Sequence, residues 1–191
     1  MATERTTIRN HPERAAPDEA VNILSAGLVA HVGIVEDGSP VVIPMSYHYD
    51  AARPDRMYLH GSIRSRLLNH LSDNALVCVS VSITDGLVYS RKAMNHSMNY
   101  RSVVLFGRSR EVADEAERCR LFDAMVQRYF PGRMSGQDYR KPPPQDLSVT
   151  ALVEVTIEEW NGKVRSGGPT GPEDDDPKAP GSAGIIDLPG T

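Results

Sequence analysis

The stretch that decides the fold is Asn95-His96-Ser97-Met98-Asn99-Tyr100-Arg101-Ser102-Val103-Val104-Leu105-Phe106-Gly107. Its second half, residues 102–106, is apolar and rich in β-branched side chains, which predicts a buried strand. Its first half is polar, and burying an unpaired polar group costs about 1–3 kcal/mol. The stretch therefore indicates one of two things: the wall of a binding site, or a loop whose polar side chains cap turns and meet water.

Length, charge and cysteines narrow the class of protein. The 191 residues predict one domain with a sizeable core, and the net charge of −4 offers no basic face to nucleic acid or to an acidic membrane. Cys78 and Cys119 lie among apolar residues outside any metal-ligand spacing, so we expect buried free thiols and no metal site. No leader peptide and no run of about 18 apolar residues is present, so we expect a soluble, cytoplasmic protein.

Apolar patterning around the opening stretch predicts a mainly β protein. Turn signals at Asp37-Gly38 and Asp85-Gly86 predict hairpins, and Pro44 predicts an edge or a bulge because proline cannot donate to a ladder. Helices are expected between Asp18 and Gly27, over 63–71, and after the capping box at Asp114. The predicted strands cover residues 28–35, 41–49, 57–62, 75–83, 87–91, 101–112 and 150–160. Such short strands without alternating βα units predict an antiparallel barrel with peripheral helices.

Composition divides the chain into three parts. Residues 1–16 are polar and predict an N-terminal arm, and residues 17–169 form the predicted barrel domain. Residues 170–191 carry five acidic side chains against one lysine and have too little apolar content to pack alone. Within this tail, the apolar patch around Ile185-Ile186 is the one part that can dock on the barrel or on a partner subunit.

A candidate phosphate site follows the predicted strand 57–62. The chain passes through Gly61-Ser62 into a predicted helix start with Ser65 and Arg66, where free N–H groups, a hydroxyl and a guanidinium favour an anion. Arg64 and Arg66 point in different directions because they lie two residues apart on a helix, and we favour Arg66. The alternative is a solvated basic helix start.

Three motifs, in this order, resemble the FMN-binding proteins related to pyridoxamine 5'-phosphate oxidase. They are Tyr58-Leu59-His60-Gly61-Ser62-Ile63-Arg64-Ser65-Arg66, His96-Ser97-Met98-Asn99-Tyr100-Arg101-Ser102-Val103, and Trp160-Asn161-Gly162-Lys163-Val164-Arg165-Ser166-Gly167-Gly168-Pro169. The resemblance extends over about residues 8–169. It implies a split β-barrel that dimerises and holds FMN at the subunit interface.

The resemblance also implies a set of cofactor-binding residues. They are Ile43, Pro44, Met45, Ser46, Tyr47, Leu59, His60, Ser62, Ser65, Arg66, Asn99, Arg101, Ser102, Trp160, Lys163 and Arg165. Leu67 stands where the oxidase has a phosphate-binding lysine, and Ser102 stands where it has a glutamine. The oxidase's C-terminal Arg-x-His-x-Arg pattern is absent, so we expect a relative with a different substrate.

The function that follows is an FMN-dependent oxidoreductase acting on a small molecule, with NAD(P)H as a candidate electron donor. Tyr100 and His60 are the candidate proton donors. His60 also aligns with a histidine of the related nitroimidazole reductases, but the interpretation we favour for it is a histidine satisfied by backbone at a strand end. The alternative function is non-catalytic binding of FMN or haem, with His60 or His96 as the candidate axial ligand.

Overall fold

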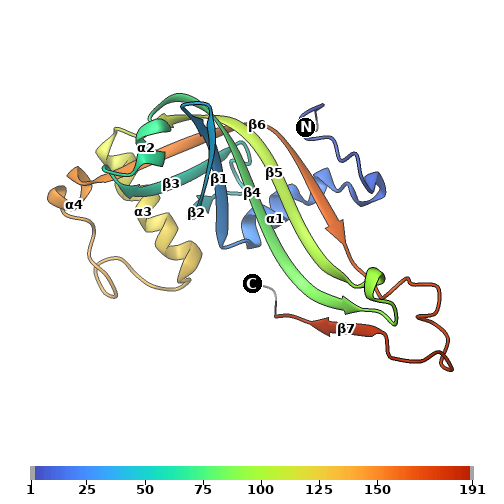
Figure 1. The fold of residues 1–191 in the computed structure, drawn as a ribbon. Helices are drawn as coiled ribbons and strands as arrows, with labels where there is room; N and C mark the ends of the chain where they lie inside the picture. Colours follow the sequence, from blue (N-terminus) through green and yellow to red (C-terminus); the bar gives the residue numbers. More distant parts are fainter. Residues whose placement is uncertain (1–2, 190–191) are drawn as a thin grey trace.

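The computed structural model describes residues 3–189, and in it six antiparallel strands pair in a ring (Figure 1). The order is β1-β2-β3-β6-β5-β4, pairing between β1 and β4 closes the ring, and β7 adds to the free edge of β4. The prediction of a mainly β, split antiparallel barrel is confirmed. The strands are β1 (Val29–Glu36), β2 (Ser39–Tyr49), β3 (Arg56–Ser62), β4 (Asp73–Tyr89), β5 (Ser97–Glu111), β6 (Thr150–Arg165) and β7 (Gly184–Asp187).

Helices lie around the barrel. They are α1 (Ala20–Ala26), α2 (Arg66–His70), α3 (Glu115–Tyr129) and α4 (Pro144–Ser148), with single 3₁₀ turns at Pro12–Arg14, Pro17–Glu19 and Ala93–Asn95. Helix α3 begins as the capping box predicts, because the carboxylate of Asp114 accepts from the backbone N–H of Glu117 at 2.7 Å. Among residues 3–189, no helix is long and apolar enough to cross a membrane.

Two apolar clusters hold the fold together. The larger fills the barrel with inward side chains of all six ring strands and of α1 and α2, such as Leu59 and Val79. The smaller lies between α3 and the outer face of β3 and β6, where Tyr58 and Leu152 pack against Leu121 and Met125. Because successive side chains of a strand point to opposite faces, Leu59 enters the barrel while its neighbours Tyr58 and His60 point toward α3.

The predicted turn at Asp85-Gly86 is wrong. Strand β4 runs through it to Tyr89 with only a register shift between Thr84 and Gly86, because β5 pairs with one edge and β7 with the other. Asp85 makes a bidentate ion pair with Arg101 of β5 instead of capping a turn. The uninterrupted β4, β5 and β6 therefore extend beyond the barrel as an arm (Figure 1).

The predictions for the first hairpin, for Pro44 and for the helix after β3 can each be compared with the structure. Asp37 and Gly38 both have positive φ and form the predicted hairpin turn between β1 and β2. Pro44 pairs with His31 without a bulge, and β3 does not pair with β2 at this point, so the edge alternative is the correct one. Helix α2 starts only at Arg66, with Ser65 as its N-cap, because the Ser65 hydroxyl accepts from the N–H of Leu68.

Both terminal segments are docked on the strands. At the N-terminus, Ala15 bridges to Lys163, and Asn161 donates to the carbonyl of Thr6 at 2.9 Å. At the C-terminus, β7 docks the Ile185-Ile186 patch along β4, which is the docking that the sequence left open. The composition of 170–191 alone therefore underestimates its order, because strand pairing supplies the contacts that its few apolar side chains do not.

Candidate functional site

A cavity of about 870 Å³ lies between α3, the 131–149 segment and the ends of β2 and β3. Apolar side chains, mainly from α3, form much of its wall, and polar side chains enter from the strands, from α3 and from the 131–149 segment. Its lining residues are Ser46, His60, Phe122, Asp123, Met125, Val126, Tyr129, Phe130, Tyr139, Arg140, Lys141, Pro142, Pro143, Asp146, Leu147 and Thr150. The volume matches a cofactor or a drug-sized ligand.

His60 is the polar group that stands out in this wall. Its ring packs edge-on against Phe122 at a centroid distance of 5.5 Å, and its Nδ1 is buried without a hydrogen-bond partner. Burial lowers the pKa of His60 because the charged imidazolium loses hydration, so the neutral ring prevails at neutral pH. A neutral imidazole with a free nitrogen is the form that binds metals and accepts protons. Asp123, which also lines the cavity, has an equally unpartnered buried Oδ1.

Tyr129 joins the end of α3 to β2 beside the cavity. Its hydroxyl accepts from the N–H of Tyr47 at 2.9 Å and lies 2.7 Å from the carbonyl of Tyr47 and 3.0 Å from that of Leu28. Strand β2 pairs with β1 up to Ser46 and with β3 only from Tyr47 onward. The Tyr129 hydroxyl thus occupies the fork at which β2 changes partner.

The predicted residues of β2 and β3 divide by face. Ile43, Met45, Tyr47 and Leu59 point into the barrel core, so only their backbone groups can serve a ligand. The outward residues of these strands are Pro44 and Ser46 on β2 and His60 on β3. Up to Ser46, the edge of β2 that faces away from β1 has no strand partner. The edge of β3 that faces away from β6 has none between His60 and Ser62. Free N–H and carbonyl groups of both strands therefore face the gap where they diverge.

The residues of the predicted phosphate site lie together before and at the start of α2, and their polar groups already have partners within the chain. The Ser62 hydroxyl accepts from the N–H of Arg64 at 3.1 Å, and the Ser65 hydroxyl caps α2. Arg66 is exposed, with its Nε 3.2 Å from the carboxylate of Glu36. An anion at this helix start must therefore compete with Glu36 for the guanidinium.

The remaining predicted residues lie on the arm. Asn99 accepts a hydrogen bond from Arg165 and donates one to the carbonyl of Gly167 at 3.1 Å. Ser102 donates to the carbonyl of Lys163 at 3.4 Å, and Lys163 donates through Nζ to the N-terminal segment. These contacts order the segment at the end of β6.

Three candidates are directed elsewhere. Arg101 is bound to Asp85, and the hydrogen bonds that the guanidinium donates to the carboxylate lower the pKa of Asp85. Trp160 lies on the inner face of β6, opposite Lys163 and Arg165, and packs against the barrel core. His96 is exposed on the arm, where its Nδ1 lies 3.2 Å from the carbonyls of Lys92 and Ala93. Of the two histidines proposed as axial ligands, the structure therefore brings only His60 into the cavity.

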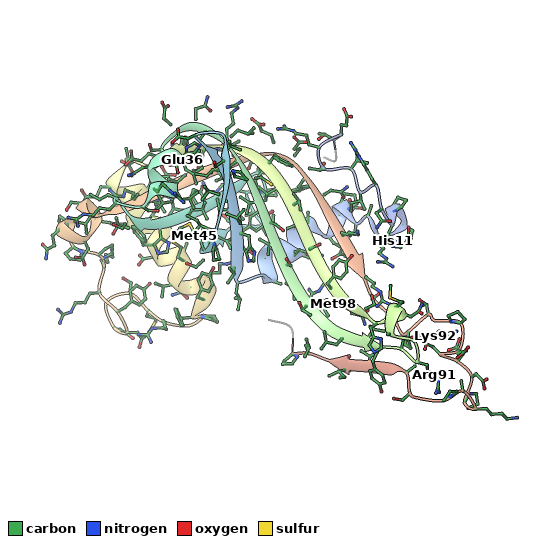
Figure 2. The ribbon with its side chains drawn as sticks, viewed as in Figure 1. His11, Glu36, Met45, Arg91, Lys92 and Met98 are labelled. Atoms are coloured by element: carbon green, nitrogen blue, oxygen red, sulfur yellow. The ribbon has the colours of Figure 1, made fainter. Side chains whose placement is uncertain are left out.

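The predicted residues thus form two groups within one chain, the β2–β3–α2 group and the arm group, and the arm of β4, β5 and β6 leads away from α2 and β3 (Figure 1). Tyr100 belongs to the arm group, where it pairs with Arg165 across β5 and β6. In Figure 2, Glu36 and Met45 lie on the barrel, and Met98, Arg91 and Lys92 lie along the arm. One copy of the chain does not assemble both groups into one site.

Sequence reasoning missed the cavity residues of α3 and of the 131–149 segment. Phe122, Val126 and Tyr129 recur at helical spacing, which equally describes a face buried in the core. Tyr139, Arg140 and Lys141 lie in a stretch without periodicity, so no local signal placed them near His60.

Comparisons with known proteins agree with this fold. A family model described as pyridoxamine 5'-phosphate oxidase matches residues 16–164. Comparison with curated proteins gives no match. Among solved structures, the flavocytochrome Anf3 from Azotobacter vinelandii is similar, with 34% identity and a TM-score of 0.84 over 97% of this chain and 85% of that one.

Two further structures are similar. An FAD and haem binding protein from Mycobacterium smegmatis has 31% identity and a TM-score of 0.80, over 92% of this chain and 84% of that one. An FAD-binding protein from Mesorhizobium loti has 19% identity and a TM-score of 0.54, over 79% of this chain and 96% of that one, which supports the fold alone.

Proposed function

The chain belongs to the pyridoxamine 5'-phosphate oxidase family, and on this premise we propose that it is a flavin-dependent oxidoreductase with its flavin between two copies of the chain. One observation carries the proposal. Strands β2 and β3 diverge after three paired positions and leave unpaired backbone groups beside a cofactor-sized cavity, at the residues expected to bind a flavin. Relatives with 34% and 31% identity are named a flavocytochrome and an FAD and haem binding protein, which supports a flavin without selecting FMN.

The residues present fit the riboflavin phosphate part that FMN and FAD share. The free edges of β2 at 43–46 and of β3 at 60–62 offer donors and acceptors to a flavin ring. Arg66 at the start of α2 is exposed and offers its guanidinium to the phosphate. When bound, the flavin supplies the hydride or electron transfer, and the protein supplies binding, orientation and charge.

A second copy of the chain completes this site. The arm group, with Asn99, Tyr100, Lys163 and Arg165, lies at the far end of its own chain, so it meets a flavin only from a partner. Outward residues of β5, including Met98 and Val104, leave exposed apolar surface along the arm. In this arrangement Lys163 or Arg165 holds positive charge near the flavin, which favours its reduced, anionic state. Of the two candidate proton donors, Tyr100 keeps that role, while His60, whose lowered pKa leaves it neutral, is suited to accept a proton from the substrate.

Haem is the second candidate ligand, and one observation favours it. The cavity is mostly apolar, and His60, whose Nδ1 is buried without a hydrogen-bond partner, is the histidine in its wall. Arg140 and Lys141, both exposed at the cavity, are of the right charge for the two propionates. His60 would hold the iron, and haem would supply one-electron chemistry beside the flavin. This pairing of ligands would make the protein a flavocytochrome in its own right.

The first experiment is the absorption spectrum of the purified full-length chain, with and without reconstitution. A bound flavin gives absorption bands at about 370 and 450 nm, and bound haem gives a Soret band. Denaturation followed by chromatography distinguishes FMN from FAD. Turnover is tested by oxidation of NADH and NADPH with nitro, quinone and pyridoxamine-phosphate substrates. A chain that binds neither FMN nor FAD after reconstitution contradicts the proposal.

A complementation experiment tests the shared site. Chains with Arg66→Ala are mixed with chains carrying Lys163→Ala and Arg165→Ala, so that one of the two sites in each heterodimer is intact. We expect each heterodimer to bind half of the wild-type flavin, so an equimolar mixture with random pairing recovers about one quarter, while each variant alone binds poorly. Equal flavin binding before and after mixing, or a monomer that retains its flavin, would contradict the shared site.

A further inference from the structure

The far end of the arm, which we call the arm tip, consists of residues 86–98 and 171–188. Arg91 donates to the carbonyls of Ala179 and Gly181, and Lys92 pairs with Glu173 at 2.9 Å, so the two basic side chains that follow β4 are used within the tip. Exposed acidic side chains remain without an ion pair among the described residues. They are Asp175, Asp176 and Asp187, whereas the exposed basic side chain of the tail is Lys178. The arm tip therefore carries an acidic excess.

Apolar side chains line up across three strands of the same tip. Leu87 of β4 pairs with Met98 of β5 on one side and with Ile186 of β7 on the other, so the three side chains share one face. They are 42%, 41% and 54% exposed, and nearby Met94 is 93% exposed. A row of apolar side chains with this much solvent exposure is typical of a surface that contacts another molecule.

The C-terminal tail is held firmly enough to form part of that surface. The buried carboxylate of Asp174 accepts from the hydroxyl of Ser90 at 2.8 Å, from the N–H of Arg91 at 2.9 Å and from the N–H of Gly171 at 2.6 Å. These bonds lower the pKa of Asp174, since they stabilise its ionised form. These bonds anchor the start of the tail beside Ser90 and Arg91, and the pairing of β7 with β4 fixes Ile186 beside Leu87.

The rim of the cavity, at the other end of the molecule, has the complementary character. Arg140 and Lys141 are exposed and make no ion pair with any residue in 3–189. Phe130, Met134 and Val149 are large apolar side chains of the same region, and each is more than half exposed. The rim therefore combines apolar surface with the adjacent, unpaired positive charges of Arg140 and Lys141, which share the cavity lining with the carboxylates of Asp123 and Asp146, and the arm tip combines apolar surface with unpaired negative charge.

We propose that the arm tip of a second copy of this chain docks on the cavity rim, so that Asp175 and Asp176 face Arg140 and Lys141 of its partner. Within one chain, the tip and the rim lie at opposite ends and do not meet (Figure 1). A two-fold axis brings each tip onto the other copy's rim and satisfies both contacts at once, which makes the interface self-complementary. A second copy is therefore the occupant that the surface fits.

This docking gives the C-terminal tail a function. It places the tip over the opening of the partner's cavity, so the ligand next to His60 is enclosed by both chains. The inference rests on the proposed dimeric function and specifies which surfaces of that dimer close the site. It also continues the shared flavin site, since the arm that carries Asn99 and Arg165 must cross β2 and β3 of the partner before its tip reaches the rim.

Charge reversal tests the contact in the full-length chain. One variant carries Arg140→Glu and Lys141→Glu, a second carries Asp175→Lys and Asp176→Lys, and a third combines all four changes. Exposed Arg9→Glu with Arg120→Glu is the matched control for two reversed charges. The dissociation constant of the dimer is measured by sedimentation velocity over a dilution series, at low and high salt.

We expect each double reversal to weaken the dimer about tenfold at low salt, because like charges then face each other across the interface. The fourfold variant should return to within about threefold of wild type, and the control should stay within about twofold, with all differences reduced at high salt. A fourfold variant no tighter than either double variant, or double variants equal to wild type, overturns the docking. A flavin-loaded dimer that ignores the reversals refutes this inference alone, whereas a chain that binds no flavin refutes the proposed function.

Discussion

Arg66 is the residue whose proposed role can be tested with a defined magnitude. We predict that Arg66→Ala weakens flavin binding, and that Arg64→Ala, two residues earlier and in the turn before α2, leaves it within about twofold. Arg66 stands at the first position of α2, and Arg64 precedes the Ser65 cap. The two variants remove the same charge and differ only in where it stands.

The size of the effect follows from the contact that Arg66 makes in the structure. A charge-assisted hydrogen bond to phosphate contributes about 1.5–3 kcal/mol. Without a ligand the guanidinium lies 3.2 Å from the Glu36 carboxylate and is 59% exposed, so breaking that pair costs about 0.2–1 kcal/mol. The difference is about 0.5–2.8 kcal/mol, which corresponds to a roughly two- to hundredfold increase in the flavin dissociation constant.

A third variant tests whether Glu36 competes with the flavin phosphate for the Arg66 guanidinium. Glu36→Gln keeps the shape of the side chain but frees Arg66, so we expect flavin to bind about two- to fivefold more tightly. Binding is measured by quenching of flavin fluorescence during titration of the apoprotein, with circular dichroism as the check on folding. Equal affinities of the Arg66 and Arg64 variants, or a weaker Glu36→Gln variant, would refute the reasoning.

Three further predictions follow from individual contacts. Tyr129→Phe should lower the free energy of unfolding by about 1–3 kcal/mol in urea, because a backbone N–H at the β2 fork loses its acceptor, while Tyr139→Phe, whose hydroxyl bonds to no described residue, should change little. Asp174→Asn should lower the melting temperature at neutral pH. Because the folded-state pKa of Asp174 is lowered, the ionised carboxylate stabilises the fold above about pH 4, and this stabilisation fades as the pH falls through that pKa. The melting temperatures of the variant and of the wild type should therefore converge in acid. If haem binds in the cavity, His60→Ala should abolish its Soret band in a haemin titration and His96→Ala should not; the reverse result would move the ligand to the arm.

The sequence by itself determined the fold class and most of its elements. Alternating apolar residues identified the barrel strands, the Asp37-Gly38 pair identified the first hairpin, and the Asp114 capping box identified the start of α3. These signals are local, because side-chain period, positive φ and a capping hydrogen bond each involve residues close in the chain. The match of the family model to residues 16–164 confirms the resemblance of the three motifs, because short motifs, like these local signals, can be recognised without knowledge of the fold.

Only the tertiary structure decided where the candidate residues lie. Asp85-Gly86 has the composition of a turn, but pairing with β5 and β7 on both edges keeps β4 extended and creates the arm. Trp160 and Lys163 stand three residues apart and face opposite sides of β6, and Arg101 is drawn to Asp85.

The cavity, too, depends on contacts that no local pattern encodes. His60 meets Phe122 across 62 positions of sequence, and the Tyr129 hydroxyl reaches Tyr47 across 82. Sequence pattern specifies which residues are buried, because burial follows hydrophobicity along each element. Which buried polar atom is left without a partner, and which exposed ends complement each other in charge, depends on how the elements pack, and that information exists only in the folded chain.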